Sequence, residues 1–167
     1  TRKSIIALNS DGSQRWIYTF PSGVMSMATA GLAGGDINND GFQDIYVAND
    51  SYERDYLYIN QGNGKFKDML EQQMQHTSFS SMGADIADIN NDGYKDFLLG
   101  CSNGFQVFFN QNGNSFSLDT EYTYDLIFGI VAADMNGDGF MDVNIQIILS
   151  LIILSLNGGN PEHKHPV

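Results

Sequence analysis

A nine-residue pattern, Asp-x-Asn-x-Asp-Gly-aromatic-x-Asp, occurs three times in this chain and constrains its fold more than any other feature. The copies span residues 36–44, 88–96 and 134–142. Each copy has side-chain oxygens at positions 1, 3, 5 and 9, glycine at position 6 and an aromatic residue at position 7. A hard cation such as Ca²⁺ binds about six to eight such oxygens, and glycine permits the sharp turn because it tolerates positive φ. The pattern therefore predicts three Ca²⁺ loops.

Fifteen residues form the predicted Ca²⁺ ligand set, five in each loop, with the position 7 residue contributing its backbone carbonyl. They are Asp36, Asn38, Asp40, Phe42 and Asp44; Asp88, Asn90, Asp92, Tyr94 and Asp96; and Asp134, Asn136, Asp138, Phe140 and Asp142. An EF-hand needs Glu at position 12, where this chain has Val47, Leu99 and Ile145. These apolar residues predict a strand after each loop instead of a helix. The alternative is a metal-free Asn/Asp/Gly turn, which does not require the closing aspartate in every copy.

The charge balance narrows the classes of partner. The 167 residues carry a formal net charge of −12, with 20 acidic residues against 8 basic ones. Nucleic acid is an unsuitable partner, because no basic stripe is available to displace counterions from phosphates. The same balance argues against docking on anionic membranes, and we expect no membrane insertion. Three Ca²⁺ ions would neutralise half of the net charge.

Cysteine usage and calcium indicate the compartment. Cys101 is the single cysteine, so no disulfide can form within the chain, and its apolar neighbours predict a buried, inert thiol. Weak Ca²⁺ loops of the extracellular type have dissociation constants of about 10⁻⁴–10⁻³ M and suit extracellular calcium. No signal peptide is visible, and the chain does not begin with Met. We interpret it as a processed product or fragment of a secreted or cell-surface protein of bacterial origin.

The order of the segments predicts an all-β, β-propeller-like array of four-stranded blades. Residues 5–20 form two β-rich runs around an Asn-Ser-Asp-Gly turn, which is a hairpin signal. The first residues of successive loops are 52 and then 46 positions apart, the scale of a propeller blade. We expect one repeat domain, 1–167. Its parts are a hairpin of a partial blade (1–23), two blades (24–78 and 79–123) and an incomplete blade (124–167).

The chain thus provides about three to three and a half blades, whereas propellers usually close with about four to eight. Either the chain is part of a longer one or neighbouring subunits complete the array. The apolar run 145–156 bears on this choice, since it reads as a strand covered on both faces, in a core or inserted into another subunit. Residues 69–76 predict one helical turn or an irregular connection.

The three loops, set between apolar strands at this spacing, resemble FG-GAP/VCBS repeats of integrin-α-like β-propellers. Two further segments, 81–88 and 52–60, resemble bacterial secreted proteins of the ASPIC/UnbV type. The resemblance covers the chain from about residue 24 onward. It implies an extracellular, calcium-stabilised propeller for adhesion, carbohydrate contact or scaffolding, with Ca²⁺ held by the fifteen residues named above. The number of blades departs from a closed propeller.

No catalytic constellation is visible, and we expect no enzyme activity. The chain has no G-x-S-x-G, H-E-x-x-H or P-loop motif. His163 and His165 have the spacing to catch a transition metal but read more simply as a solvated tail, and His76 stands alone in a connection. The charged segment 50–55 reads as a solvated connector or a partner contact. It overlaps an N-glycosylation sequon, Asn49-Asp-Ser.

Three hypotheses of function stay open. The first is a calcium-rigidified extracellular module that self-associates into a filament or surface layer, or binds another extracellular protein, by adding strands to a neighbouring subunit. The second is a glycan-binding module, suggested by Tyr and Asn residues near the loops. The third is an accessory propeller domain of a polysaccharide-active enzyme.

Overall fold

The structure is a computed structural model that describes residues 4–19, 29–50, 54–74, 80–123, 127–147 and 150–155. Within these ranges the backbone forms thirteen β-strands and one short helix. The strands form a two-stranded hairpin, two four-stranded sheets and one three-stranded sheet, and neighbouring strands within each sheet are antiparallel. The predicted all-β fold class, with four-stranded antiparallel sheets like propeller blades, is confirmed.

The strands of each sheet are neighbours in the order in which they occur in the chain. The hairpin contains β1 (Ser4–Leu8) and β2 (Gln14–Thr19). The first four-stranded sheet contains β3 (Thr29–Gly35), β4 (Asp44–Asn49), β5 (Tyr56–Asn60) and β6 (Phe66–Asp68). The second contains β7 (Ser81–Ala87), β8 (Asp96–Cys101), β9 (Gly104–Asn110) and β10 (Phe116–Thr123). The third contains β11 (Ile127–Ala133), β12 (Asp142–Ile147) and β13 (Ser150–Ser155).

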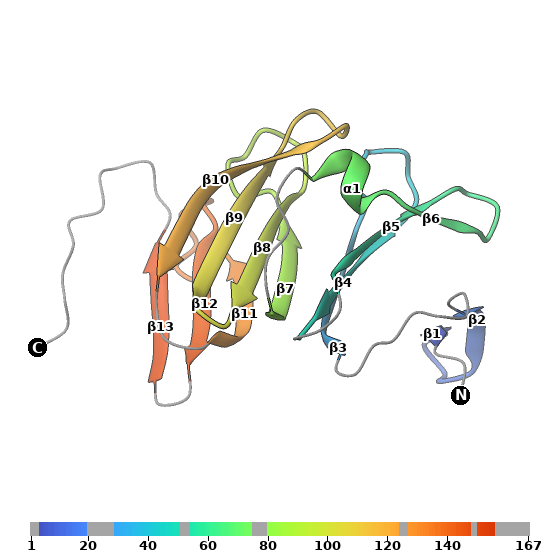
Figure 1. Cartoon of the computed structure of the whole chain (residues 1–167), viewed down its shortest axis with the longest axis horizontal. Helices are drawn as coiled ribbons and strands as arrows, with labels where there is room; N and C mark the ends of the chain where they lie inside the picture. The colour runs from blue at the N-terminus through green and yellow to red at the C-terminus, as the bar shows by residue number, and fades with distance from the viewer. Residues whose placement is uncertain are drawn as a thin grey trace, which may run out of the picture.

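The sheets follow one another across the molecule, from the hairpin near the N-terminus to the third sheet on the opposite side (Figure 1). Their first strands approach closely, with β3 against β7 and β7 against β11. A Cβ atom on Gly31 would lie 3.3 Å from the backbone nitrogen of Ala84, and one on Gly35 would lie 2.7 Å from Cγ2 of Ile86. Glycine at these positions lets the sheets converge along their first strands.

Large side chains fill the space where the sheets diverge from this line. Between the first and second sheets the rings of Tyr46 and Phe97 lie 4.8 Å apart, and those of Phe97 and Phe116 lie 4.4 Å apart. A second cluster, which includes Phe105 and Ile127, lies between the second and third sheets. Glycine and alanine near the convergence, with aromatic residues farther out, give the sheets the radial packing of propeller blades.

A smaller aromatic cluster joins the hairpin to the first four-stranded sheet. The ring of Tyr18 lies 5.3 Å from Phe66 and 5.6 Å from Tyr58, and Trp16 lies 5.6 Å from Phe66. Trp16 is only half-buried. Cys101 is 2% exposed, and the expectation of a buried thiol is confirmed.

The segment after β6 forms a single helical turn, α1 (Leu70–Gln73), one of the two forms expected for it. Oδ1 of Asp68 accepts a hydrogen bond from the backbone N–H of Leu70 (3.2 Å). The Leu70 side chain is fully buried in the core between the first and second sheets. Because of this anchor, the connection between the two sheets starts from a fixed point.

The apolar run that begins at Ile145 is divided between two strands of the third sheet, β12 and β13. The chain reverses after Ile147, and β12 and β13 pair antiparallel with Ile147 opposite Ser150. Antiparallel pairing satisfies backbone hydrogen bonds between two short strands within one sheet. Residues 145–150 contain no Gly, Pro, Asn or Asp, so no residue type marks a turn between these two strands.

Two sequence-based expectations concern residues outside the described ranges: the isolated His76 and the His163/His165 pair. The described part of the chain contains no helix with the length and apolar character needed to cross a membrane.

Candidate metal centre

The three predicted loops occupy equivalent places in the fold. Each one connects the first strand of its sheet to the second: β3 to β4, β7 to β8 and β11 to β12. All fifteen predicted ligand residues lie in these loops or at the first residue of the strand that follows. The sequence pattern therefore identified a repeated structural unit.

Positive φ angles curl each loop at the same two positions. Position 6 is Gly41, Gly93 or Gly139, with φ of 87°, 90° and 86°. Position 4 is also left-handed, at Asn39 (58°), Asn91 (60°) and Gly137 (77°). Residues other than Asn, Asp and Gly rarely adopt this left-handed backbone conformation. The residue types at positions 4 and 6 therefore match the backbone.

The aspartate at position 1 holds the curl from inside. In the first loop, Asp36 Oδ1 accepts a hydrogen bond from the N–H of Asp40 (3.0 Å), and Oδ2 accepts one from Gly41 (2.9 Å). Asp88 and Asp134 accept the corresponding bonds in the second and third loops. One carboxylate therefore collects two backbone donors of its own loop.

Positions 3 and 5 meet beside it. The Asn38 amide donates to Asp40 Oδ2 at 2.9 Å, and the equivalent distances in the second and third loops are 3.0 and 3.1 Å. Asp40 Oδ1 accepts from the N–H of Phe42 (2.8 Å). We call positions 1, 3 and 5 the loop mouth. Three oxygen-bearing side chains therefore gather on one side of each loop, at or near the surface.

The aspartate at position 9, the closing aspartate, behaves differently because it is buried. Asp44 is 0% exposed, and its two oxygens accept hydrogen bonds from the N–H groups of Ile37 (3.0 Å) and Asn60 (2.8 Å). Asp96 makes the same contacts with the N–H groups of Ile89 and Asn110. This side chain therefore connects its loop to the third strand of the same sheet, a role that the ligand pattern did not reveal.

Burial is the largest influence on the pKa of the closing aspartates of the first and second loops. It raises the pKa of Asp44 and of Asp96, because the loss of hydration outweighs the stabilisation of the carboxylate by backbone N–H groups. The acidic side chains at the loop mouth also raise the pKa of Asp44 and of Asp96, because their negative charges repel the carboxylate. A cation at the loop mouth would reverse this repulsion and favour the ionised form.

The donor chemistry of the loops fits a hard cation. Carboxylate, amide and carbonyl oxygens are the ligands that Ca²⁺ prefers, and a carboxylate oxygen that accepts one hydrogen bond keeps a second lone pair. Within the described ranges, Asp, Glu, His and Cys side chains alone form no group of three or more that could hold a metal. A Ca²⁺ ion at one of these loops would therefore need the asparagine amide and the position 7 carbonyl as ligands in addition to the acidic side chains.

The aromatic rings of Phe42 and Phe140, at position 7 of the first and third loops, lie against neighbouring segments. A Cβ atom on Gly62 would lie 2.7 Å from the Phe42 ring, so Phe42 packs on the β5–β6 turn. Phe140 lines a cavity of about 370 Å³ between the second and third sheets, together with Phe109, Asp119 and Tyr122. This cavity combines aromatic faces with a carboxylate beside the second and third loops.

Contacts between consecutive loops also escaped the sequence interpretation. The Asn110 amide donates to the carbonyl of Ile37 in the first loop (2.9 Å) and to that of Lys95 in the second loop (2.8 Å). Asn39 donates to the Gly93 carbonyl of the second loop, and Asn91 to the Gly139 carbonyl of the third. The loops therefore form a connected row.

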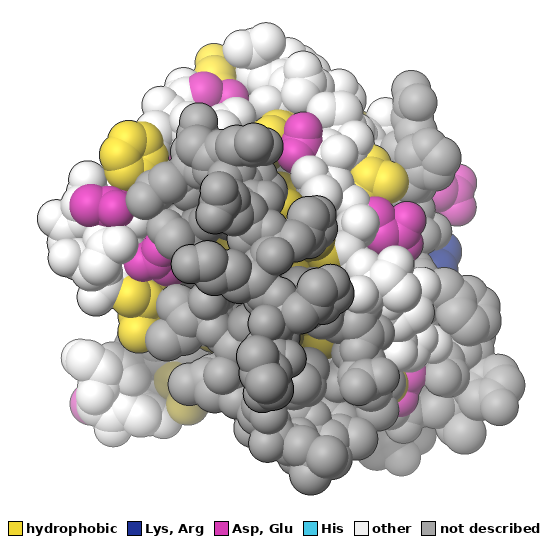
Figure 2. Space-filling model, turned by 90° about the vertical axis from the view of Figure 1, so that its left-hand side faces the viewer, with side chains coloured by type: hydrophobic (Ala, Val, Ile, Leu, Met, Phe, Trp, Pro, Cys, Tyr) yellow, Lys and Arg dark blue, Asp and Glu magenta, His cyan; other side chains and the backbone are white. Residues whose placement is uncertain are grey.

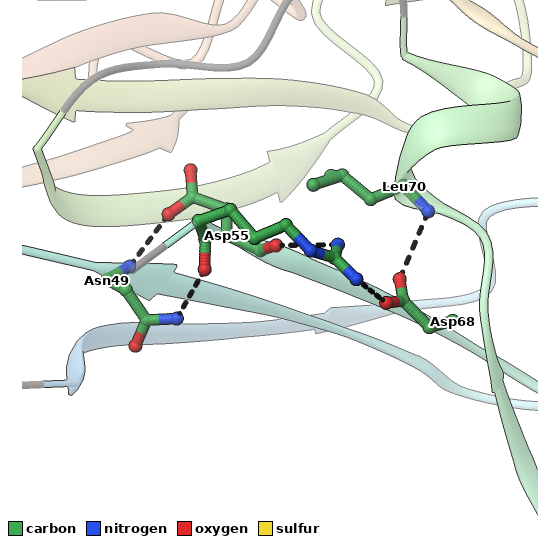
Figure 3. A network of polar contacts seen from close by, with 5 residues as sticks. Asn49, Asp55, Asp68 and Leu70 are labelled. Atoms are coloured by element: carbon green, nitrogen blue, oxygen red, sulfur yellow. Dashed lines mark hydrogen bonds and ion pairs between the residues drawn. The ribbon is translucent and has the colours of Figure 1, made fainter. Parts of the chain in front are cut away.

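Asp55, the last residue of the charged segment 50–55, is buried, contrary to the expectation of a solvated connector, whereas Arg54 beside it is exposed. Asp55 is 1% exposed and accepts hydrogen bonds from the Tyr46 and Ser81 hydroxyls and from the N–H of Asn49. Arg54 pairs with Asp68, which also caps Leu70 (Figure 3). The buried hydroxyl and amide donors compensate for the carboxylate's loss of hydration.

The sequon asparagine lies in the same network. Asn49 is 1% exposed, and its amide donates to the Arg54 carbonyl (2.8 Å) (Figure 3). A glycan on this amide would require β4 to separate from the segment before β5. The folded chain therefore offers no accessible glycosylation site at Asn49.

The described surface agrees with the acidic composition. On the face drawn in Figure 2, acidic side chains are interspersed with apolar ones, and Lys or Arg side chains are scarce. The exposed large apolar side chains include Leu32, Val131 and Phe140, each about half exposed.

Comparison with known proteins gives a consistent result. The model of a family described as the FG-GAP-like repeat matches residues 36–99 and 88–144, and the two matches begin at the first residues of the first and second loops. The matched family is that of a repeat and not that of an enzyme.

Integrin alpha chains are among the similar curated proteins. The chain is 34% identical to integrin alpha-6 of Gallus gallus over 98 residues, which is 52% of this chain and 9% of that protein. It is 36% identical to integrin alpha-3 of Mus musculus over 80 residues, 41% of this chain and 8% of that protein. The chain therefore spans less than a tenth of the length of these relatives, which limits the comparison to the repeats.

Proposed function

Because the chain belongs to the FG-GAP-like repeat family, we propose that it is a non-enzymatic, extracellular module that Ca²⁺ stiffens and that works through contacts with other molecules. The observation that carries this proposal is the equivalence of the three loops. The same donors, the same curl and the same buried closing aspartate occur in each one. Ordinary turns between strands would not need this repetition.

In this proposal each loop holds one Ca²⁺ through its five predicted ligands. The ion supplies a positive charge among three acidic side chains, and the loop's backbone hydrogen bonds orient those side chains. A ligand at a hundred times its dissociation constant contributes about 2.7 kcal/mol per site to the free energy of unfolding. Three independent sites would contribute about 8 kcal/mol, comparable to the stability of a whole domain.

The decisive experiment compares thermal unfolding in millimolar Ca²⁺ with unfolding in excess chelator. We expect a large fall in melting temperature in chelator and its full recovery when Ca²⁺ is restored. Mg²⁺ at the same concentration serves as the control for ionic strength and divalent charge. An identical melting temperature in Ca²⁺ and in chelator would contradict the proposal.

The proposed contacts are with further copies of the chain or with another extracellular protein, as in adhesion, a filament or a surface layer. Half-exposed apolar side chains such as Leu32 and Val131, on the first strands of the first and third sheets, support a contact role. The proposal includes a secreted bacterial origin of the ASPIC/UnbV type. Sedimentation analysis at increasing protein concentration in Ca²⁺ should reveal assembly, and a monomer at all concentrations would exclude self-association.

A second candidate function is glycan binding, alone or as an accessory domain of a polysaccharide-active enzyme. The cavity of about 370 Å³ lined by Tyr122, Phe140 and Asp119 favours it, since sugars stack on aromatic faces and donate hydrogen bonds to carboxylates. A glycan array tests this candidate, with Asp119→Ala as the matched variant for any hit. An array without hits would contradict the glycan-binding function.

A further inference from the structure

Two asparagine side chains join consecutive loops in the same way. Nδ2 of Asn39 donates to the carbonyl oxygen of Gly93 at 3.2 Å, and Nδ2 of Asn91 donates to that of Gly139 at 3.2 Å. In both cases the donor is at position 4 of one loop and the acceptor is at position 6 of the next. The contact recurs at both junctions, so it belongs to the repeat.

The backbone alone does not explain asparagine at position 4. Asn39 and Asn91 adopt left-handed φ angles of 58° and 60°, but glycine serves the same purpose at Gly137, with φ of 77°. Position 4 is also not one of the proposed ligand positions. What asparagine adds over glycine is a side chain that reaches the neighbouring loop.

The accepting peptide group is part of the second loop's proposed metal centre. The Gly93 carbonyl and the Tyr94 N–H belong to one planar peptide group. That N–H donates to Oδ1 of Asp92 (2.8 Å), a proposed ligand, and the carbonyl of Tyr94 is another. Asn39 therefore fixes one end of a peptide whose other end orients a ligand carboxylate.

Asn39, the donor of this hydrogen bond, lies equally close to the proposed metal centre of the first loop. Asn39 lies in sequence between two proposed ligands, Asn38 and Asp40, whose side chains contact each other (2.9 Å). An ion that orders these two residues also restricts the backbone of Asn39 between them. The path from one centre to the next therefore runs through one hydrogen bond and two short backbone segments.

From this geometry we infer that Asn39 and Asn91 are positioning residues that couple Ca²⁺ binding in neighbouring loops. The inference rests on the proposed calcium function. Occupancy of the first loop favours binding in the second, and occupancy of the second favours binding in the third. Thermodynamic linkage makes each coupling reciprocal. One exposed hydrogen bond supplies the coupling at each junction, so we expect occupancy of one loop to change the Ca²⁺ affinity of its neighbour by about 3- to 10-fold.

The test reads each loop separately in the whole chain. The backbone amides of Gly41, Gly93 and Gly139 report the three loops in nitrogen–proton NMR spectra during a titration with CaCl₂. Asp40→Asn weakens binding in the first loop by removing a carboxylate. We expect this substitution to lower the affinity reported by Gly93 by about 3- to 10-fold.

The coupling should disappear when the asparagine side chain is removed. In the presence of Asn39→Gly, which keeps the left-handed backbone, adding Asp40→Asn should leave the affinity reported by Gly93 unchanged. Asn91→Gly is the matched control. It makes the same chemical change at the next junction, so the first and second loops should stay coupled while the second and third become independent.

The outcomes separate this inference from the function on which it rests. If all three amides respond to Ca²⁺ but Asp40→Asn changes the second loop equally with and without Asn39, the coupling is refuted and the calcium function stands. If Asp40→Asn changes only the first loop in the otherwise native chain, the loops are independent and the coupling is again refuted. If no amide responds to millimolar Ca²⁺, the proposed function fails, and the inference fails with it.

Discussion

The loop mouth and the closing aspartate carry the same acidic residue but belong to different environments. Asp40 and Asp92 are exposed, whereas Asp44 and Asp96 are 0% exposed and accept backbone N–H groups from two places in their sheet. The difference shows that one nine-residue pattern contains two functions. In the proposed function the mouth provides donors for a cation, whereas the hydrogen bonds of the closing aspartate fasten the loop to the sheet without a metal.

The largest expected effect comes from substitutions at the loop mouth, which should affect calcium-dependent stability and leave the metal-free fold intact. We expect the triple variant Asp40→Asn/Asp92→Asn/Asp138→Asn to lose most of the calcium-dependent stability, about 8 kcal/mol at saturating Ca²⁺, since each loop loses a carboxylate ligand. In chelator its free energy of unfolding should stay within about 1 kcal/mol of the native chain, because these side chains are exposed. Urea unfolding in both conditions measures this. A large loss in chelator would mean that the mouth also fastens the fold.

The closing aspartate should show the opposite behaviour. Asp96→Ala leaves the buried N–H groups of Ile89 and Asn110 without their acceptor, so we expect a loss of about 3–5 kcal/mol in chelator. Asp92→Ala, four residues earlier and exposed, is the matched control and should cost less than about 1 kcal/mol there. Equal losses of stability for the two variants in chelator would contradict the distinction between the loop mouth and the closing aspartate.

A smaller effect is expected at the residue that joins one loop to the next sheet. Asn110→Ala removes the amide that binds the carbonyls of Ile37 and Lys95, and we expect a loss of about 1–3 kcal/mol in chelator. Asn60 is its counterpart in the first sheet, and its amide donates to the Gln43 carbonyl of the same sheet. Asn60→Ala should therefore cost less, as measured by urea unfolding. The reverse order would argue against inter-sheet anchoring by Asn110.

The smallest effect concerns pH. Burial raises the pKa of Asp96 above its ordinary value near 3.9. The folded state therefore retains this proton to higher pH than the unfolded state, and the associated stability is lost as pH rises through the folded-state pKa. In chelator we expect the native chain to lose stability relative to Asp96→Asn, which cannot titrate, as the pH rises from the ordinary aspartate pKa through the raised folded-state pKa. Urea midpoints across this range measure the difference, and a constant difference would contradict it.

The strands and loops were predictable because their signals are local. Short apolar runs rich in Tyr, Phe, Ile and Val indicate strands such as β5 and β9, and an Asn-Gly pair marks the turn after each of them. The loop pattern also placed all fifteen candidate ligands in equivalent loops. Nothing in the spacing distinguished Asp44 from Asp36, however, because burial depends on how β5 lies against the loop.

The contacts that the sequence did not predict join distant segments. The Asn110 amide donates to the carbonyl of Ile37, 73 residues earlier in the chain. The Ser81 hydroxyl in the second sheet donates to Asp55, which precedes β5 of the first sheet. A charged Asp55 after a polar stretch is typical of a surface loop, and only the packing of the sheets surrounds it with hydroxyl donors. The position 4 asparagines did carry a signal, since they occupy non-ligand positions in two loops, but their acceptors appear only in three dimensions.

The order of the strands within the sheets has a consequence for biosynthesis. Each sheet is built from consecutive strands, so its pairings join segments close in sequence. Contacts of this kind form rapidly and can form while later parts of the chain are still being made. A growing polypeptide of this type can therefore fold one sheet at a time, and each completed sheet offers its glycine-lined first strand as the surface on which the next one assembles.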